Sequence, residues 1–337
     1  MRATFHILHI PLHCSLRNIL LSLFAACAAA LSCGAAAQAF PAKSVRIVVP
    51  FPPGGAADLL TRALGKRLSE TWGQAVVADN RPGAGGNIGA EATAKSAPDG
   101  YTLLMGAVTT HAVSMSLYNK LGYDLEKDLM PVSLVANVPH ILVAHPSVPA
   151  ANVTELLAWL KSQGGKVAFA SQGNGTLSHL EYELMKSMGG FTANHIPYKG
   201  QRPGQADLLA GNVLLFFDSI PSSLPQVRAG KLKGIGVASS RRTPVLPDLP
   251  TLAEGGLTGF AADSWFGIMA PAGTPREIVS KLNADIVKAL DSDEVKAIIT
   301  RQGGEVMGST PERMAQQIRS DREKWGKVVR DSGAKIE

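Results

Sequence analysis

Cysteine is nearly absent from this sequence. Its 337 residues contain three cysteines, Cys14, Cys27 and Cys33, and all of them lie within the first 39 residues. If that segment is removed, the remaining chain has no disulfide, no free thiol and no cysteine-based metal site. It does not need a covalent staple, because a chain of this length buries enough surface to build an adequate core.

Sequence motifs typical of the common enzyme classes are also missing. Neither Gly-x-Ser-x-Gly nor His-Glu-x-x-His occurs, and there is no phosphate-binding Walker loop. The histidines after residue 39 have no metal-ligand spacing; they are His111, His140, His145, His179 and His195. We therefore expect neither an enzyme nor a bound metal or cofactor. A secreted hydrolase assembled from residues far apart in the chain is the remaining enzymatic alternative.

Acidic residues and lysine are absent from the N-terminal segment. Residues 1–39 contain Arg2 and Arg17, followed by an apolar run from Ile19 to Leu31 and an Ala-x-Ala pattern that ends at Ala39. This pattern predicts a secretory signal peptide cleaved after Ala39. A lipidated signal is an alternative, although neither of the last two cysteines has Leu three residues before it. No later run reaches about 18 apolar residues. We expect a soluble protein of the bacterial periplasm.

Clusters of basic residues are absent as well. The formal net charge is +6, and it falls to +4 when the two arginines of residues 1–39 are removed. Lysine and arginine are scattered along the chain without interleaved aromatic residues, which argues against a nucleic-acid partner. A modest positive balance slightly favours small anionic ligands.

What is present is an alternation of strand-like and helix-like segments, which predicts the α/β class with mostly parallel sheets. Strands are expected at 45–49, 75–79, 101–107, 132–138, 167–171, 213–217 and 233–237. Asn152 with Glu155 predicts a capped helix start, and Thr274-Pro275 and Thr310-Pro311 predict two more. If the chain crosses twice between two lobes, residues 40–140 and 263–337 form one lobe and 141–262 the other. A single continuous split is the alternative.

The loop from Pro50 to Asp58 joins the first strand to the first helix. It reads Pro-Phe-Pro-Pro-Gly-Gly-Ala-Ala-Asp, in which proline stiffens the backbone and glycine lets N–H groups approach a ligand. The helix N-terminus adds unpaired donors and a partial positive charge, so this loop could hold a carboxylate or phosphate. An ordinary strand–helix connection is the other interpretation of the same residues.

A second loop of the same kind makes anion binding the favoured interpretation. Ser171-Gln172-Gly173-Asn174-Gly175-Thr176 again follows a strand and precedes a helix. Ligands of open α/β sheets bind at the carboxyl ends of strands, so two such loops could close on one small anion. The glycine-rich loop at 80–89 has the spacing Gly83-x-Gly85-x-x-x-Gly89, which does not fit a dinucleotide-binding fingerprint.

Together these segments closely resemble the periplasmic receptors of tripartite tricarboxylate transporters, the Bug-type receptors. The resemblance spans essentially all of the chain after residue 39 and rests on residues 50–58, 80–86, 98–103, 171–180, 197–200 and 249–251. It implies a two-lobed, type II-like "Venus flytrap" with a central ligand cleft, which captures a carboxylate and presents it to a membrane permease. It also implies that one ligand carboxylate is held largely by backbone donors and ordered water.

The predicted ligand-binding residues come from both lobes: Phe51, Gly54, Gly55, Ala56, Asp58, Thr110, Ser171, Gly173, Thr176, His179, Tyr198, Gly200 and Asp218. Several keep a second interpretation. Asp58 could instead cap the following helix, Thr110 could be a helix cap, and His179 could be a structural histidine. Asp218 could accept from a ligand or stabilise the crossing between the lobes.

The expected function is a periplasmic solute-binding receptor, acting as a monomer, that delivers a small carboxylate to transporter membrane subunits. The alternative is a ligand sensor that acts on a membrane signalling partner. The sequence leaves the carboxylate unidentified.

Overall fold

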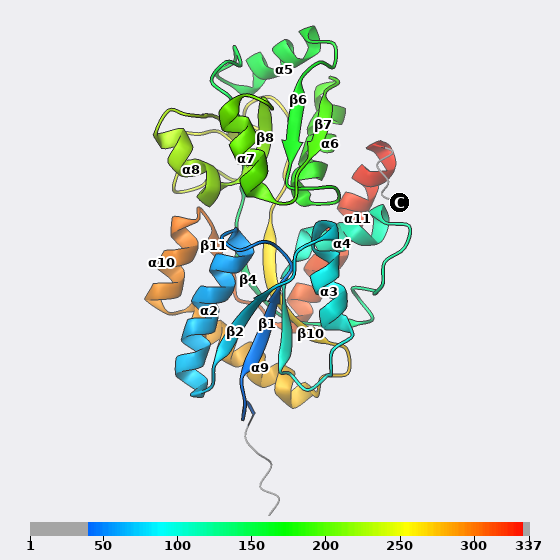
Figure 1. The fold of residues 1–337 in the computed structure, drawn as a ribbon, viewed down its shortest axis with the longest axis vertical. Coiled ribbons are helices and arrows are strands. Elements are labelled where there is room, and N and C mark those ends of the chain that lie inside the picture. The colour runs from blue at the N-terminus through cyan, green and yellow to red at the C-terminus, as the bar shows by residue number, and fades with distance from the viewer. Residues whose placement is uncertain (1–39, 333–337) are drawn as a thin grey trace, which may run out of the picture. The chain divides into compact units, whose positions relative to one another are not determined.

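The computed structural model describes residues 40–332, so the predicted signal peptide lies outside the described residues. Helices and strands alternate along most of the chain (Figure 1). Their order is β1 Val45–Val49, α2 Ala56–Trp72, β2 Val76–Asn80, η1 Ala84–Gly86, α3 Asn87–Ala94, β3 Thr102–Ala107, α4 Val108–Leu117, β4 Leu129–Asn137, β5 His140–Ala144, α5 Val153–Ser162, β6 Ala168–Ser171, α6 Leu177–Gly189, β7 Asn194–Pro197, α7 Gln201–Ala210, β8 Leu215–Ser219, α8 Ile220–Arg228, β9 Lys233–Val237, β10 Trp265–Pro271, α9 Arg276–Leu290, α10 Asp293–Arg301, β11 Glu305–Val306 and α11 Pro311–Ser332.

Two β-sheets organise the compact unit that begins at Lys43. The first sheet has the strand order β11-β4-β10-β3-β1-β2, and the second has the order β7-β6-β8-β5-β9. Helices α2, α9 and α10 lie around the first sheet, and α5, α6, α7 and α8 lie around the second (Figure 1). This is the two-lobed α/β architecture that the sequence predicts.

The sheets are mixed, so the prediction of mostly parallel sheets is wrong. Strands β1, β2 and β3 pair in parallel, as do β6, β7 and β8. In contrast, β10 runs antiparallel to β3 and β4, and β5 runs antiparallel to β8 and β9. The physical reason is that the chain leaves the first sheet along β4, enters the second along β5, and returns from β9 to β10, so the outgoing and returning strands run in opposite directions.

The chain passes between the two sheets in two segments that are bonded to each other. One segment joins β4 to β5 and the other joins β9 to β10. The Val138 N–H donates to the Ser264 carbonyl at 2.9 Å, and the Ser264 N–H donates to the side-chain oxygen of Asn137 at 3.0 Å. Asn137 also donates to Asp263 at 3.0 Å. These bonds fix the two segments side by side.

Several predicted element boundaries are confirmed. Strands β1 and β9 have the predicted bounds. Asn152 accepts from the Glu155 N–H at 2.9 Å, while the Glu155 carboxylate accepts from Ala151, which is a reciprocal cap. Helix α4 is not among the predicted elements, because it follows β3 without a break and begins with Val108 and two threonines. Such β-branched residues favour strands unless tertiary contacts override them.

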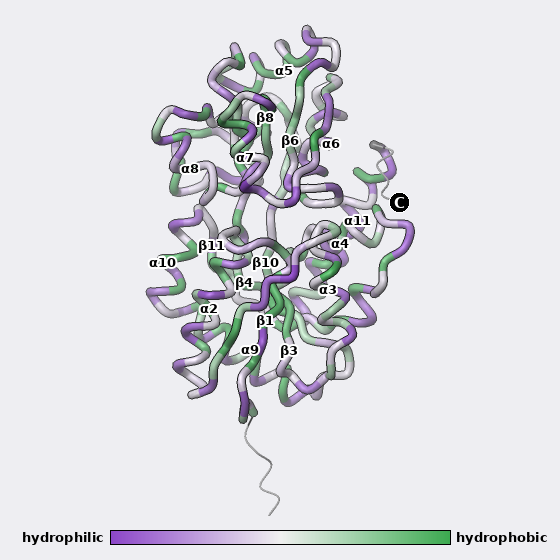
Figure 2. Tube along the Cα trace, viewed as in Figure 1, coloured by the Kyte–Doolittle hydropathy of each residue, from purple (hydrophilic) through white to green (hydrophobic). Residues whose placement is uncertain are grey.

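The core does not divide cleanly between the two sheets. Figure 2 shows apolar residues along the strands, whereas apolar and hydrophilic residues alternate along the helices. One buried cluster combines strand residues of the second sheet, such as Phe169 and Phe217, with Leu117 from α4 and Trp325 and Val329 from α11. Helices α4 and α11 therefore attach to both sheets. Within residues 40–332, no helix is both long and apolar enough to cross a membrane.

Candidate functional site

A cavity lies between the loops that follow the strands of the two sheets. Its volume is about 80 Å³, several times the roughly 10–15 Å³ that one buried water needs. The first sheet and its loops supply Phe51, Pro52, Pro53, Gly55, Ala56, Ala57, Ala107, Thr110, Ser264 and Phe266. The second contributes His140, Gln172, Thr176, Leu177, Lys199, Gly200, Gln201, Arg202, Pro203 and Ser219.

The N-termini of helices from both sheets point donors at this cavity. The cap residues of α2, α6, α7 and α8 are Gly55, Thr176, Gly200 and Ser219, and all four line it. None of these residues caps its helix through a side chain. The helix dipoles and the first-turn N–H groups that have no protein partner therefore favour a negatively charged ligand. At α6 the first N–H, on Leu177, already donates to the Thr110 hydroxyl.

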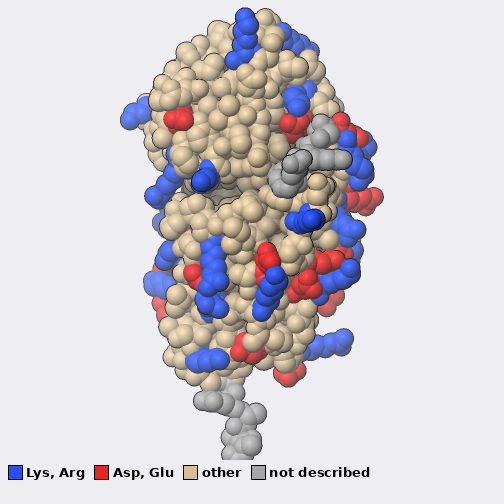
Figure 3. Space-filling view, turned by 45° about the vertical axis from the view of Figure 1, so that its right-hand side comes forward, with Lys and Arg blue, Asp and Glu red and all other residues tan. Residues whose placement is uncertain are grey.

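The charged side chains around the cavity agree with that polarity. Lys199 and Arg202 line it, and none of the described lining residues is Asp or Glu. Elsewhere the charges are dispersed: on the face shown in Figure 3, Lys and Arg are spread over both lobes and interspersed with Asp and Glu. Among the described residues, the face shown therefore has no large patch of one charge, whereas the charged side chains that line the cavity, Lys199 and Arg202, are cationic.

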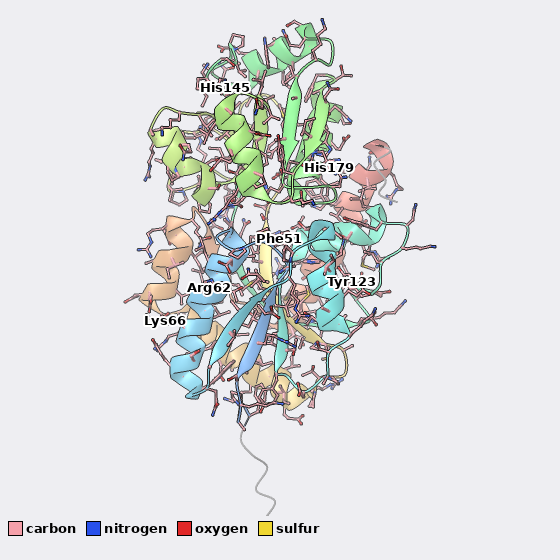
Figure 4. All side chains as sticks on the ribbon, viewed as in Figure 1. Phe51, Arg62, Lys66, Tyr123, His145 and His179 are labelled. Carbon is pink, nitrogen blue, oxygen red and sulfur yellow. The ribbon has the colours of Figure 1, made fainter. Side chains whose placement is uncertain are left out.

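Hydrogen bonds to the Asp58 carboxylate hold the loop between β1 and α2 in place. The Asp58 carboxylate accepts from the Gly54 N–H at 2.9 Å, from Arg62 at 3.0 Å and from Asn80 at 3.0 Å. Burial acts to raise the pKa of Asp58, but these hydrogen bonds and the charge of Arg62 outweigh it and lower the pKa. Asp58 therefore holds the loop, and it leaves the first-turn N–H groups of Ala56 and Ala57 without a side-chain cap. In Figure 4, Arg62 lies on α2 below Phe51.

Replacing Asp58 with Ala tests this support. We expect Asp58→Ala to lower the free energy of unfolding by roughly 1.5–3 kcal/mol, because a buried carboxylate with charged and neutral donors is lost. Ligand affinity should fall at the same time, because the loop loses the bond to Gly54. Urea unfolding and calorimetry measure both effects. Asp58→Asn, which keeps one acceptor, should lose less, and equal losses in the two variants would contradict the argument.

The loop between β6 and α6 is held mainly by its own residues. The Thr176 hydroxyl donates to the Gly173 carbonyl at 2.8 Å, and the Gly173 N–H donates to the Ser171 hydroxyl at 3.2 Å. The Gly175 N–H donates to Nδ1 of His179 at 3.3 Å. The polar side chains of Ser171 and His179 therefore shape the loop, and Thr176 also reaches the cavity.

A pair of stacked histidines supports the same loop. The rings of His179 and His195 lie 4.2 Å apart with an interplanar angle of 6°, and Nε2 of His195 is 2.6 Å from the Ser171 hydroxyl. Burial lowers the pKa of His195 to about 4, with a further contribution from the charge of Lys186. Burial likewise lowers the pKa of His179 to about 3, helped by the neighbouring charges of His195 and Lys186. Both rings are neutral at neutral pH.

These low pKa values predict a loss of stability in mild acid. An unfolded histidine takes up its proton near pH 6.5, whereas folded His195 does so only near pH 4. Its contribution to stability is therefore present above pH 6.5 and lost as the pH falls toward 4. Between pH 7.5 and pH 5 the free energy of unfolding of the wild type should fall by roughly 1–2 kcal/mol more than that of His195→Gln, which has no imidazole to protonate. If urea unfolding gives the same pH dependence of stability for the wild type and His195→Gln, the low pKa of His195 is wrong.

Two other predicted residues are engaged away from the cavity. The Tyr198 hydroxyl donates to Asp207 at 2.6 Å. Asp218 is fully buried and accepts from the Ser223 hydroxyl at 2.7 Å and from the Ser219 N–H at 2.9 Å. Burial raises the pKa of Asp218 to about 6, against the lowering effect of these donors and of the charge of His140. Asp218 lies behind the cavity wall and not on its surface.

The structure brings part of the predicted set together. Phe51, Gly55, Ala56, Thr110, Thr176 and Gly200 line the cavity. Gly54, Asp58, Ser171, Gly173, His179, Tyr198 and Asp218 lie outside the lining. Gly54 is nonetheless adjacent, since a Cβ there would clash with the guanidinium of Arg202, which lines the cavity.

The sequence reasoning missed the start of α7 and the crossing segments. Gln201, Arg202 and Pro203 line the cavity directly after Gly200, and the Gly200 N–H donates to the Gln172 carbonyl at 3.0 Å. A glycine followed by a helix start was the available signal. His140 directly follows the first crossing segment and Ser264 ends the second, and only the paired topology places them at the cavity.

The two halves of the cavity touch each other. The Leu177 N–H, at the start of α6, donates to the Thr110 hydroxyl of α4 at 3.3 Å. The Tyr118 hydroxyl donates to the Asn174 carbonyl at 3.4 Å. A Cβ on Gly200 would lie 3.2 Å from the ring of Pro52. The loops of both sheets therefore enclose the space between them.

A two-lobed α/β unit with a cavity between the lobes, lined by uncapped helix N-termini, defines the periplasmic solute-binding proteins as a class. Comparison with known proteins gives the family. The model of the tripartite tricarboxylate transporter family receptor matches residues 60–334. Protein BugT of Bordetella pertussis is 40% identical over 309 residues, which covers 91% of this chain and 95% of BugT. The chain belongs to the tripartite tricarboxylate transporter receptor family.

Solved structures support the same assignment. The periplasmic binding protein BugD has a TM-score of 0.83 and 33% identity, covering 88% of this chain and 100% of BugD. Rpa4515 from R. palustris, solved with adipate, has a TM-score of 0.84 and 37% identity, covering 88% of this chain and 100% of that one. MatC from Rhodopseudomonas palustris, with bound malate, has a TM-score of 0.81 and 35% identity, and the match covers 86% of this chain and 100% of MatC.

These findings confirm the predicted family and fold. Members of the family are periplasmic solute-binding receptors and not enzymes, so the protein is a receptor without a catalytic role.

Proposed function

We propose that this receptor captures a small carboxylate in the cavity between its lobes and delivers it to the membrane subunits of a tripartite tricarboxylate-type transporter. The observation that carries the proposal is the convergence of uncapped helix N-termini from both sheets on a cavity lined by Lys199 and Arg202. Backbone donors and helix dipoles stabilise a carboxylate there without a metal.

The ligand class is supported by the related structures. Adipate and malate, named with two structural relatives, are both small dicarboxylates. In this chain the apolar surfaces of Phe51, Leu177 and Phe266 would bury the ligand body between its charged ends.

The lobes would close on the ligand by a hinge motion. We assign residues 40–140 and 263–337 to one lobe and 141–262 to the other, with the hinge in the two crossing segments. The contact of Leu177 with Thr110 joins the two sides of the cavity, and closure would link ligand occupancy to the surface that a partner meets. The receptor would act as a monomer, exported by a signal peptide cleaved after Ala39.

The alternative is a receptor that signals to a membrane sensor. Both functions require carboxylate binding, so uptake assays separate them. Deleting the receptor should abolish uptake of the ligand if the partner is a permease, and deleting the permease should do the same. Uptake that persists without the receptor would favour the sensor.

Direct binding tests the ligand class. Mass spectrometry of compounds that co-purify with residues 40–337, followed by calorimetry with adipate, malate and the corresponding diamides, should show binding of the acids only. Equal binding of the diamides, or no binding of any acid, would contradict the proposal.

A further inference from the structure

His140 is a buried histidine on the wall of the cavity. It is the first residue of β5, directly after the segment in which the chain first passes between the two sheets. Only 5% of its surface is exposed, and it lines the cavity. Its Nδ1 lies 2.6 Å from the Glu181 carboxylate of α6, which is fully buried. The imidazole thus joins a buried carboxylate to the ligand space.

The charges around His140 come from several elements. Glu181 belongs to α6 and Asp218 to β8. Lys199, just before α7, and Arg202, in the first turn of α7, line the cavity. The charge of Asp263, between β9 and β10, contributes to raising the pKa of Glu181. Burial acts to lower the pKa of His140, but the charge and hydrogen bond of Glu181 and the charge of Asp218 outweigh it and raise the pKa.

The geometry leaves one ring nitrogen for a ligand. Nδ1 donates to Glu181, and no described residue bonds Nε2. His140 lines the cavity, and its Nε2 is not among the buried side-chain atoms without a partner, so we infer that the Nε2–H is accessible to a ligand there. The second oxygen of Glu181 is buried without a partner, so this carboxylate has no neutralising contact other than His140 among the described residues. Burial raises the pKa of Glu181 despite the charge and hydrogen bond of His140, which act to lower it. When the Glu181 carboxylate is ionised, the proton on His140 compensates its charge, which favours the imidazolium.

We propose that the His140 imidazolium, positioned by Glu181, binds a second carboxylate of the ligand and makes this receptor selective for dicarboxylates over monocarboxylates. The inference rests on the proposed carboxylate-binding function. The uncapped helix N-termini hold one end of the ligand, and His140 donates a charge-assisted hydrogen bond to the other end.

Calorimetry with a matched ligand pair tests the selectivity. Adipate and hexanoate have the same number of carbons and differ in one carboxylate. The wild type should bind adipate at least about 10-fold more tightly than hexanoate, as expected for a charge-assisted hydrogen bond. In His140→Gln that preference should fall to within about threefold. His145→Gln is the matched control: His145 directly follows the same strand, bonds Ser147 and lies away from the cavity (Figure 4).

Glu181→Gln separates a positioning role from a structural one. Without the carboxylate, burial favours the neutral ring, so the variant should bind adipate more weakly than the wild type at pH 8. The wild type should bind adipate more tightly than Glu181→Gln by a smaller factor at pH 6 than at pH 8, because the ring of the variant is protonated more fully at pH 6. The titration of adipate and of Asp218 is common to both proteins and largely cancels in the ratio of the two affinities. Nitrogen NMR of the ring should show an imidazolium in the wild type at pH 7.

The outcomes separate the two proposals. If neither acid binds the wild type, the proposed function itself is wrong. If both acids bind the wild type with equal affinity, or if His140→Gln weakens both acids equally while the melting temperature is unchanged, only the role of His140 is wrong. A neutral ring in the NMR spectrum, with the adipate preference retained in His140→Gln, would also overturn it.

Discussion

Gly55→Leu is expected to weaken carboxylate binding by about 100-fold or more, which corresponds to roughly 2.8 kcal/mol of binding free energy. Gly55 lies at the first cap position of α2 with φ −85° and ψ 174°, a conformation that any L-residue adopts without strain. A Cβ there would point across the cavity and lie 3.5 Å from the side chain of Gln201. A leucine side chain would therefore occupy the ligand space while the fold remains intact.

The control for this prediction is Gly55→Ala. Its single methyl group would make an ordinary contact with Gln201, so the affinity should change by less than about 10-fold. Gly54 would be a poor control, because its φ of +87° strains any side chain. Calorimetry measures the affinity, and circular dichroism checks the fold. If a folded Gly55→Leu variant retains the affinity of the wild type, the ligand does not lie at the N-terminus of α2.

Trp325→Ala is expected to lower the free energy of unfolding by about 3–5 kcal/mol. Trp325 is 1% exposed and joins α11 to the buried cluster of the second sheet. Losing the indole leaves a large cavity that the surrounding helices cannot fill, and it weakens the attachment of α11 to the second lobe. Because total stabilities are about 5–15 kcal/mol, this is a large fraction of what holds the protein folded.

Lys327→Ala on the same helix is the matched control for the tryptophan. Lys327 pairs with Asp331 on the exposed face of α11, and exposed ion pairs contribute little. Its unfolding free energy should remain within about 0.5 kcal/mol of the wild type. Urea unfolding of both variants measures the difference. A small loss in Trp325→Ala would show that α11 is only loosely attached to the second lobe.

The attachment of α11 also bears on how the lobes move. Trp325 and Val329 come from the C-terminal segment, which we assign to the first lobe, yet they pack against the core of the second. Closure about the two crossing segments must therefore either repack this contact or carry the end of α11 with the second lobe.

The sequence determined the elements whose signals are local. The Pro50–Asp58 segment joins β1 to the first turn of α2 because proline, glycine and the amphipathic helix pattern act over a few residues. The capped start at Asn152 depends likewise on a pattern of four residues. The family, too, could be predicted, because its motifs are spread over nearly the whole chain.

Only the tertiary structure decided how those parts combine. Strands β5 and β10 are antiparallel to their neighbours β8 and β3 because the chain passes twice between the sheets. The direction of a strand cannot be predicted from a short apolar run. His140 and Arg202 reach one cavity from segments about 60 residues apart, so no local pattern could pair them. Glu181 and Asp218 became partners of His140 for the same reason. Local propensity fixes turns and caps, whereas long-range packing decides which turns meet and which charges become buried.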